Sequence, residues 1–279
     1  MTNEKFGGVS AVENWPGSEQ VGLRPTYFRE FEMFYPFKRR VDNLVRFLTR
    51  DANLGLLYYE EPDFTGHKFG PESKEMDQKL IELDKFIGYF IAKMEDAGLY
   101  NRTNIIITSD HGMASVDRSK VVTIPGDILK LVDLEKSRFT RMTGLIYPKS
   151  DQVYPMLKKL QGKYRDVLKV WKKSEIPTRF HYTHNSRIPP IVITVKLPYS
   201  IKASRLRFKK GDHGWFLPES GPSDMFPFFL ARGPDISKNS IPLEPFENVS
   251  VYPLCCKLLK ISPAANNGTL DQLSPYLLN

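Results

Sequence analysis

Short apolar runs alternate along the chain with helical patterns. Residues 54–59 and 104–108 are nearly continuous apolar stretches of strand length, which is typical of buried strands. Between them, apolar residues recur at steps of three and four, which predicts an amphipathic helix. The apolar positions of this helix are Met76, Leu80, Leu83, Ile87, Phe90, Ile91 and Met94. Ser73 is suited to cap its start, and Gly98 is suited to the position just past its end.

Further elements follow the same alternation. Apolar runs predict strands at 144–147, 191–195 and 226–230. Helical patterns lie near 152–163 and 249–259. The stretch 197–210 shows neither period and is expected to be a loop. This alternation favours an α/β protein whose central sheet is mainly parallel and flanked by helices. No segment reads as an interdomain linker, so we predict a single domain over residues 1–279.

Composition and charge narrow the class of protein. With 41% hydrophobic and 26% charged residues, the chain reads as an ordinary globular protein, and no apolar run is long enough to span a bilayer. The net charge of +8 is spread over clusters at 37–40, 169–175 and 205–210, which we interpret mainly as solvated surface. The alternative is a role in attracting phosphate-bearing substrates. The sequence has no nucleic-acid motif, so no nucleic-acid polymer is expected as a partner.

The sequence features that indicate a cellular compartment disagree with one another. The first ten residues lack the apolar core and cleavage site of a signal peptide. Cys255 and Cys256 are adjacent, so they imply no disulfide framework. By contrast, three N-glycosylation sequons begin at Asn101, Asn248 and Asn267, and they point mildly to the secretory route.

The candidate chemistry centres on the tripeptide Asp-His-Gly, which occurs at 110–112 and again at 212–214. In parallel α/β sheets, ligands bind beyond the carboxyl ends of strands. Asp63 and His67 follow the first predicted strand, and Asp110 and His111 follow the second. If these strands are neighbours, the four side chains converge on loops at one edge of the sheet.

His213, in the second tripeptide, is the fifth candidate and precedes the strand predicted at 226–230. Carboxylates and imidazoles together suit Zn²⁺. A single Asp-His-Gly is usually only a turn, and it is the number of candidates that favours a metal site. Asp212 follows a loop, so we expect it to support a ligand from behind or to face solvent. His181 and His184 have no such setting and are interpreted as structural.

With these residues identified, the chain resembles the nucleotide pyrophosphatase/phosphodiesterase family of the alkaline phosphatase superfamily. The matching segments occur in the family's order: WPGS (15–18), RPTYF (24–28), YYEEPDFTGHKFGP (58–71), NIIITSDHGM (104–113), RFHYTHNSRIPPI (179–191), GDHGW (211–215), FENVSVYPLCC (246–256) and NNGT (266–269). Together they extend over nearly the whole chain.

The resemblance implies a two-zinc site. Asp63, His67 and His213 match the ligands of one zinc, and Asp110 and His111 match two ligands of the other. In the family, the second zinc also takes an aspartate and a nucleophilic threonine from a segment before WPGS, which begins here at residue 15. We therefore expect no catalytic nucleophile in this chain, and an alkaline-phosphatase-like sheet that lacks its first strand. The missing signal peptide would belong to the same segment.

Aromatic residues match the family's substrate pocket. They are Trp15 together with an aromatic from Tyr27, Phe28 or Phe31, and among the last three we favour Tyr27 and Phe31. The alternative is that these are ordinary core aromatics.

The implied function is zinc-dependent hydrolysis of phosphodiester or pyrophosphate bonds in extracellular nucleotides or related small phosphoesters. Membrane contact is expected only through an anchor outside this chain. The alternative is a non-catalytic truncated form that binds zinc or serves as an interaction module. A sulfatase or phosphomonoesterase of the same superfamily is disfavoured by WPGS and FENVSVY.

Overall fold

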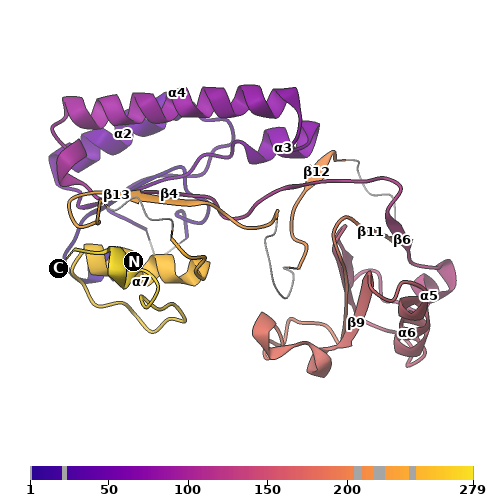
Figure 1. Ribbon diagram of the computed structural model, residues 1–279. Helices are drawn as coiled ribbons and strands as arrows, with labels where there is room; N and C mark the ends of the chain where they lie inside the picture. The colour runs from indigo at the N-terminus through magenta and orange to yellow at the C-terminus, as the bar shows by residue number, and fades with distance from the viewer. Residues whose placement is uncertain (1, 21–23, 204–208, 217–223, 239–242, 279) are drawn as a thin grey trace. The chain divides into compact units, whose positions relative to one another are not determined.

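The computed structural model describes residues 2–20, 24–203, 209–216, 224–238 and 243–278 (Figure 1). The chain forms two compact units. The first unit comprises residues 1–62, 78–108 and 229–279, and the second comprises 63–77 and 109–228. A single domain over the whole chain stays a prediction. No helix within the described ranges is both long enough and apolar enough to cross a bilayer.

A three-stranded parallel sheet forms the centre of the first unit. Strand β1 (Ser10–Glu13) lies between β2 (Tyr27–Arg29) and β3 (Leu54–Leu57), and Ala11 pairs with Tyr27 on one side and with Gly55 on the other. All four residues of β1 are buried, as expected of a central strand. This sheet confirms the expected α/β class.

Two long helices pack together beside this sheet. Helix α2 (Phe37–Arg50) and helix α4 (Lys74–Asp96), which begins in the second unit, lie side by side in Figure 1. Their shared core includes Phe37, Val41, Val45 and Met94. The predicted boundaries of α4 are confirmed. The Ser73 hydroxyl accepts a hydrogen bond from the Met76 N–H at 3.2 Å, and Gly98 adopts the left-handed conformation with φ 66°.

The remaining described elements of the first unit are short. Strand β4 (Ile105–Thr108) pairs antiparallel with β13 (Phe229–Arg232), and no ladder joins β4 to β3 among the described strands. Helix α1 (Thr2–Lys5) precedes the sheet, η1 (Tyr100–Arg102) precedes β4, and η4 (Asn248–Ser250), α7 (Val251–Leu258) and η5 (Ser274–Tyr276) follow β13.

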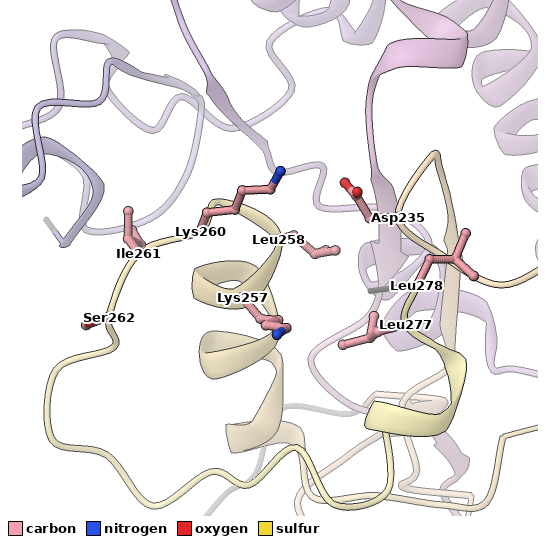
Figure 2. Close-up of a pocket in the computed structure, with 8 residues that line it drawn as sticks. All are labelled: Asp235, Lys257, Leu258, Lys260, Ile261, Ser262, Leu277 and Leu278. Carbon is pink, nitrogen blue, oxygen red and sulfur yellow. The ribbon is translucent and has the colours of Figure 1, made fainter.

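Figure 2 shows a pocket of about 470 Å³ at the end of α7. Its lining includes Asp235, Lys257, Lys260 and Leu277. The Asp235 carboxylate is already engaged, because it accepts a hydrogen bond from the Asn104 amide at 2.7 Å. None of the described residues that line this pocket belongs to the predicted site.

The second unit is built on a four-stranded antiparallel sheet. Its strands lie in the order β7 (Arg138–Phe139), β8 (Thr143–Ile146), β10 (Ile191–Val195) and β9 (Leu168–Lys172). Helices α5 (Gly126–Lys130) and α6 (Val153–Lys163) belong to the same unit, and its core includes Val122, Leu157, Leu168, Ile193 and Trp215. η2 (Lys173–Glu175) and η3 (Thr178–Phe180) complete this part.

Short ladders complete the second unit. Strand β11 (Ser200–Lys202) pairs parallel with β6 (Val121–Thr123), and β12 (Gly211–Asp212) pairs antiparallel with β5 (Ala114–Ser115). β11 lies inside the stretch that the sequence indicates is loop. A strand of three residues is too short to show the alternation of apolar and polar positions from which strands are predicted. Its pairing with β6 is a long-range contact, which the local sequence does not reveal.

The charged cluster at 37–40 was expected to be solvated surface, but one of its charged side chains, Arg40, is buried. Arg40 is fully buried, and its Nη1 lies 2.9 Å from the Glu60 Oε2. Its Nε donates to the Tyr35 carbonyl at 2.8 Å and its Nη1 to the Tyr58 carbonyl at 2.7 Å. Burial of this charge is possible because a carboxylate and two carbonyls satisfy it. Residues 205–208 of another charged cluster lie outside the described residues.

Removal of the Arg40 guanidinium should destabilise the first unit strongly. Arg40→Met leaves the Glu60 carboxylate buried without its cation, and we expect the free energy of unfolding to fall by about 3–5 kcal/mol. Arg29→Met is the control, since Arg29 pairs with Glu32 at the surface, and it should cost less than about 1 kcal/mol. Urea denaturation at pH 7 measures both. Equal effects in the two variants would contradict this assignment.

Candidate metal centre

Helix α3 (Asp63–Phe69) positions the first two candidate ligands. The sequence analysis places Asp63 and His67 on a loop, and this is wrong, because the segment is helical. Asp63 lies in the first turn, where a carboxylate is favoured by the helix dipole. Residues four apart share one helix face, and the Asp63 Oδ2 accordingly lies 3.4 Å from the His67 Nε2.

The two Asp-His-Gly tripeptides meet in space. In the ladder between β5 and β12, Asp212 pairs with Ala114 and Gly211 with Ser115. Each strand adjoins one tripeptide, so the two histidines come together. The rings of His111 and His213 stack with centroids 3.6 Å apart and planes inclined by 13°.

Gly112 allows the first tripeptide to approach its neighbours closely. Its N–H donates to the Met225 carbonyl at 2.9 Å, and a Cβ at this position would lie 1.8 Å from the Asp224 carbonyl oxygen. Gly214, in the second tripeptide, has φ 103°, a conformation that favours glycine. The loops that carry both histidines therefore depend on glycine, though for different reasons.

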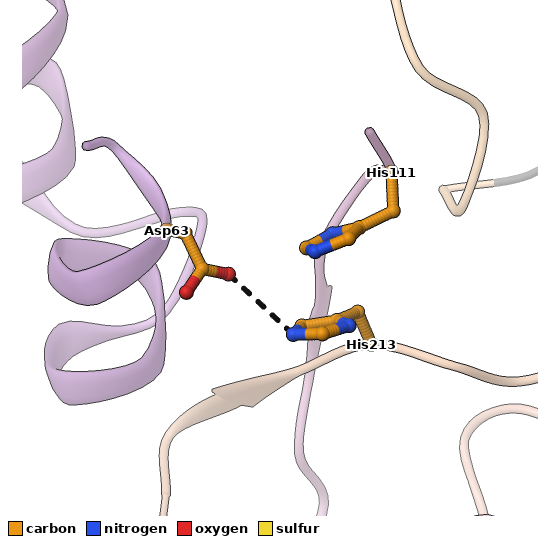
Figure 3. Close-up of side chains that lie close together, drawn as sticks. All are labelled: Asp63, His111 and His213. Atoms are coloured by element: carbon orange, nitrogen blue, oxygen red, sulfur yellow. Dashed lines mark ion pairs between the residues drawn. The ribbon is translucent and has the colours of Figure 1, made fainter. Parts of the chain in front are cut away.

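Asp63, His67, His111 and His213, termed the Asp–His cluster below, lie in the second unit. Figure 3 shows three of them, with the Asp63 carboxylate facing His213. The His213 Nε2 lies 3.5 Å from the Asp63 Oδ1 and 3.2 Å from the His67 Nε2. Side-chain atoms of Asp63, His111 and His213 lie within 4.8 Å of one another, as do those of His67, Asp212 and His213.

These separations fit a zinc ion. Tetrahedral Zn²⁺ with bonds of about 2.0–2.1 Å holds adjacent ligand atoms about 3.3–3.4 Å apart. The distances of 3.2–3.5 Å among Asp63, His67 and His213 are close to that spacing, taken from the Asp63 Oδ2 to His67 and from its Oδ1 to His213. In addition, the Asp63 Oδ1 is buried and accepts no hydrogen bond from any described residue. A buried carboxylate oxygen without a hydrogen-bond donor suits a cation.

The protonation of the imidazoles also suits metal binding. Burial, and then the nearby charge of His111, lowers the pKa of His213, so its ring is neutral at pH 7. The His67 Nδ1 lies 2.9 Å from the Gly211 carbonyl and the His111 Nδ1 lies 2.8 Å from the Gly112 carbonyl. A proton on each Nδ1 leaves the Nε2 lone pair available to a metal.

Asp110 lies at the exposed edge of the cluster. Its Oδ1 accepts the His111 N–H at 3.1 Å, and its Oδ2 lies 3.5 Å from the His111 Nε2. The side chain of Asp110 is 68% exposed. Asp110 and His111 are thus adjacent, as expected of two ligands of one ion.

The predicted aromatic residues belong to the first unit. Trp15 and Phe31 both contact the ring of Tyr58 edge-on, with centroids 6.0 and 5.9 Å away. Tyr27 stacks on Phe47 at 4.3 Å, in agreement with the interpretation of this residue as a core aromatic. Trp15 is 40% exposed and remains available for a ligand.

Other candidates lie at the surface. The sequon asparagines Asn101, Asn248 and Asn267 are exposed. His181 and His184 are exposed as well, and neither joins the groups of potential metal ligands among the described residues.

Residues that the sequence analysis does not predict surround the cluster. Arg141 carries no sequence signal, yet its Nε lies 2.9 Å from the Asp212 Oδ2. The Lys209 Nζ lies 3.1 Å from the His67 Nε2 and 3.6 Å from the Asp212 Oδ1. Asp212 itself is buried, which excludes the solvent-facing alternative.

Comparisons with known proteins place this geometry in context. Residues 1–216 match the family described as type I phosphodiesterase/nucleotide pyrophosphatase. The chain is 34% identical over 292 residues to the Xenopus laevis bis(5'-adenosyl)-triphosphatase, with 100% of this chain and 61% of that protein covered. It is 34% identical over 289 residues to the human ectonucleotide pyrophosphatase/phosphodiesterase family member 5, with 99% and 58% covered. The chain thus spans about 60% of the length of these relatives.

A solved structure agrees with the sequence comparisons. It is murine ectonucleotide pyrophosphatase/phosphodiesterase 5, an inactive threonine-to-alanine variant in complex with AMP. The TM-score is 0.86 at 33% identity, with 99% of this chain and 73% of that chain covered.

Gly112→Ala should disturb the cluster through the backbone. The new methyl group meets the Asp224 carbonyl, and we expect the free energy of unfolding to fall by about 1–3 kcal/mol. Zinc should bind more weakly, because His111 moves with its loop. Gly126→Ala is the control, since no atom lies within 4 Å of a Cβ there. Differential scanning fluorimetry with and without zinc measures both effects. A Gly112→Ala chain that behaves like Gly126→Ala would contradict the close approach.

Asp63→Asn tests the metal centre directly. Changes to outer partners of metal ligands weaken binding by about 10–100-fold, so loss of a direct carboxylate ligand should exceed about 100-fold. The control is Asp117→Asn, because Asp117 is an exposed carboxylate whose Oδ1 accepts hydrogen bonds from the neighbouring Ser119. Competition with a chromophoric chelator gives the zinc Kd. Equal Kd values for the two variants would remove Asp63 from the site.

Proposed function

Because the chain belongs to the type I phosphodiesterase/nucleotide pyrophosphatase family, we propose that it provides the zinc-binding part of a hydrolase acting on phosphodiester or pyrophosphate bonds of extracellular nucleotides. The observation that supports this most is the mutual spacing of 3.2–3.5 Å among Asp63, His67 and His213. We assign these three to one zinc, and Asp110 and His111 to a second.

Zinc bound at these residues would supply positive charge for the oxygens of a displacement at phosphorus. The chain's own residues have defined tasks in this scheme. The Asp63 carboxylate and the imidazoles of His67 and His213 would hold one cation, and the backbone carbonyls of Gly211 and Gly112 accept a hydrogen bond from a protonated Nδ1 of His67 and of His111. Trp15, with Phe31 nearby against Tyr58, offers an aromatic surface to a nucleoside.

The nucleophile and the remaining zinc ligand are proposed to lie in the longer protein, outside these 279 residues. Support comes from the murine relative, in which a threonine-to-alanine variant is inactive. In the same proposal, an additional strand from that segment completes an alkaline-phosphatase-like sheet. Extracellular or cell-surface placement is supported by the ectonucleotidase relatives and by the exposed sequons Asn101, Asn248 and Asn267.

A zinc-binding form without turnover is the second candidate. It is favoured by the second zinc position, to which we assign just Asp110 and His111 among the described residues. Two protein ligands are fewer than the three or four of known zinc sites. The 279-residue chain assayed alone is expected to be inactive under both candidates. Turnover by a protein that also carries the proposed nucleophile separates them, because only the hydrolase candidate predicts it.

The longer protein that contains this chain should hydrolyse a nitrophenyl ester of a nucleoside 5'-monophosphate. Excess chelator should abolish the release of nitrophenolate, and added Zn²⁺ should restore it. The 279-residue chain alone should release none. Hydrolysis that persists in excess chelator would refute the zinc mechanism, and turnover by the isolated chain would refute the external nucleophile.

A further inference from the structure

Asp212 contacts two of the proposed metal ligands, His67 and His213, and its other contacts argue against its being a ligand itself. Its Oδ2 lies 2.9 Å from the Arg141 Nε, and its Oδ1 accepts the His213 N–H at 3.1 Å. The same Oδ1 lies 3.7 Å from the His67 Nδ1 and 3.6 Å from the Lys209 Nζ. Both carboxylate oxygens are therefore committed to donors, and the side chain is only 11% exposed.

A direct role as a ligand fits these contacts poorly. His67, Asp212 and His213 do bring ligand atoms within 4.8 Å of one another. However, the Asp212 Oδ2 already pairs with the Arg141 Nε at 2.9 Å, and a divalent ion bound to Asp212 would lie beside that guanidinium, where like charges repel. The neighbouring Asp63 Oδ1 is in the opposite situation, since it is buried and accepts no hydrogen bond from the described residues. The cation belongs with Asp63.

We propose that Asp212 and Arg141 form a positioning pair that holds His213 and His67 in the geometry that binds zinc. Asp212 fixes the backbone of His213 through its N–H, and its negative charge favours a proton on the His67 Nδ1, which the Gly211 carbonyl also accepts. The His67 Nε2 then faces Asp63 and His213. Arg141, from the β7–β8 connection, keeps the Asp212 carboxylate in one orientation.

The surrounding charges explain why an acidic residue suits this position. Without Asp212, the buried side of the cluster would hold Arg141, Lys209 and a divalent ion close to the three imidazoles. Asp212 adds a second negative charge behind the ligands, and the β12 ladder holds it in place. Carboxylates that orient metal-bound histidines in this way raise metal affinity by about 10–100-fold.

Zinc titration of the 279-residue chain tests this proposal, which rests on the proposed function. Asp212→Asn and Arg141→Met should each weaken zinc binding by about 10–100-fold. Arg141→Lys retains the positive charge and should recover part of the loss. Glu60→Gln is the matched control, because it also removes a buried carboxylate from an arginine but contacts no member of the Asp–His cluster. Its zinc Kd should stay within about 2-fold of that of the parent chain.

Cobalt spectra separate positioning from ligation. At saturating Co²⁺, Asp212→Asn should keep the visible absorption bands of the parent chain, because the ligand set is unchanged. Bands that change shape and intensity, together with tighter binding in Arg141→Met, would identify Asp212 as a ligand and overturn the proposal. Unchanged zinc affinity in both Asp212→Asn and Arg141→Met would also overturn it.

The zinc affinity of Asp63→Asn distinguishes failure of the proposed function from failure of the positioning pair. If zinc affinity does not depend on Asp63, the metal centre itself is wrong. If Asp63→Asn abolishes binding while Asp212→Asn and Arg141→Met bind zinc like the parent chain, only the positioning pair is wrong. Variants that do not fold are recognised by far-UV circular dichroism in chelator, and Arg141→Lys then serves as the decisive variant.

Discussion

The close approach of imidazole nitrogens around one carboxylate is the constraint on which the rest of the site depends. The Nε2 atoms of His67 and His213 lie 3.2 Å apart, and the Nδ1 of His67 already faces a backbone carbonyl. This separation is close to that of two adjacent nitrogen ligands of one tetrahedral Zn²⁺ ion. Asp63 adds a buried oxygen that accepts no hydrogen bond from the described residues. The arrangement is therefore understandable as a metal site and difficult to explain as a turn.

Local structure rather than a long scaffold brings these atoms together. One turn of helix α3 carries Asp63 and His67, and a ladder of two residue pairs joins the Asp-His-Gly tripeptides. Gly112 permits the close approach of the first loop, and Gly214 permits the positive φ of the second. Behind this layer, Asp212 and Arg141 hold the second tripeptide. The α3 ligands are thus placed by local structure, whereas the meeting of the two tripeptides depends on a contact between segments that are far apart in the sequence.

Elements with strong periodicity could be predicted from the sequence. Helix α4 begins and ends at its capping residues, and strand β10 coincides with the predicted apolar run at 191–195. Strand β1 could not be found, because it has four residues and ends in Glu13, a buried carboxylate. The antiparallel partners of β10 could not be foreseen either, since a strand buried on both faces reads the same in parallel and antiparallel sheets.

The candidate site also contains residues that could be predicted from the sequence and residues that could not. Five predicted ligands could be named because their residue types are visible in the sequence, four of them directly after predicted strands and His213 in the repeated Asp-His-Gly. The helix at 63–69 was missed because seven residues with an internal glycine and threonine carry a weak helical signal. Arg40 and Arg141 were missed because burial of a charge depends on a partner that only the fold supplies, twenty residues away for Glu60 and seventy-one for Asp212.

X-ray absorption at the zinc edge of the zinc-loaded chain tests the central claim most directly. The account predicts a first shell of nitrogen and oxygen at about 2.0–2.1 Å with the multiple-scattering pattern of imidazole. Loss of much of that pattern in His213→Ala would assign the imidazoles to this cluster. A first shell of sulfur at about 2.3 Å would place the metal at cysteine and contradict the account. A shell of oxygen alone would contradict it as well.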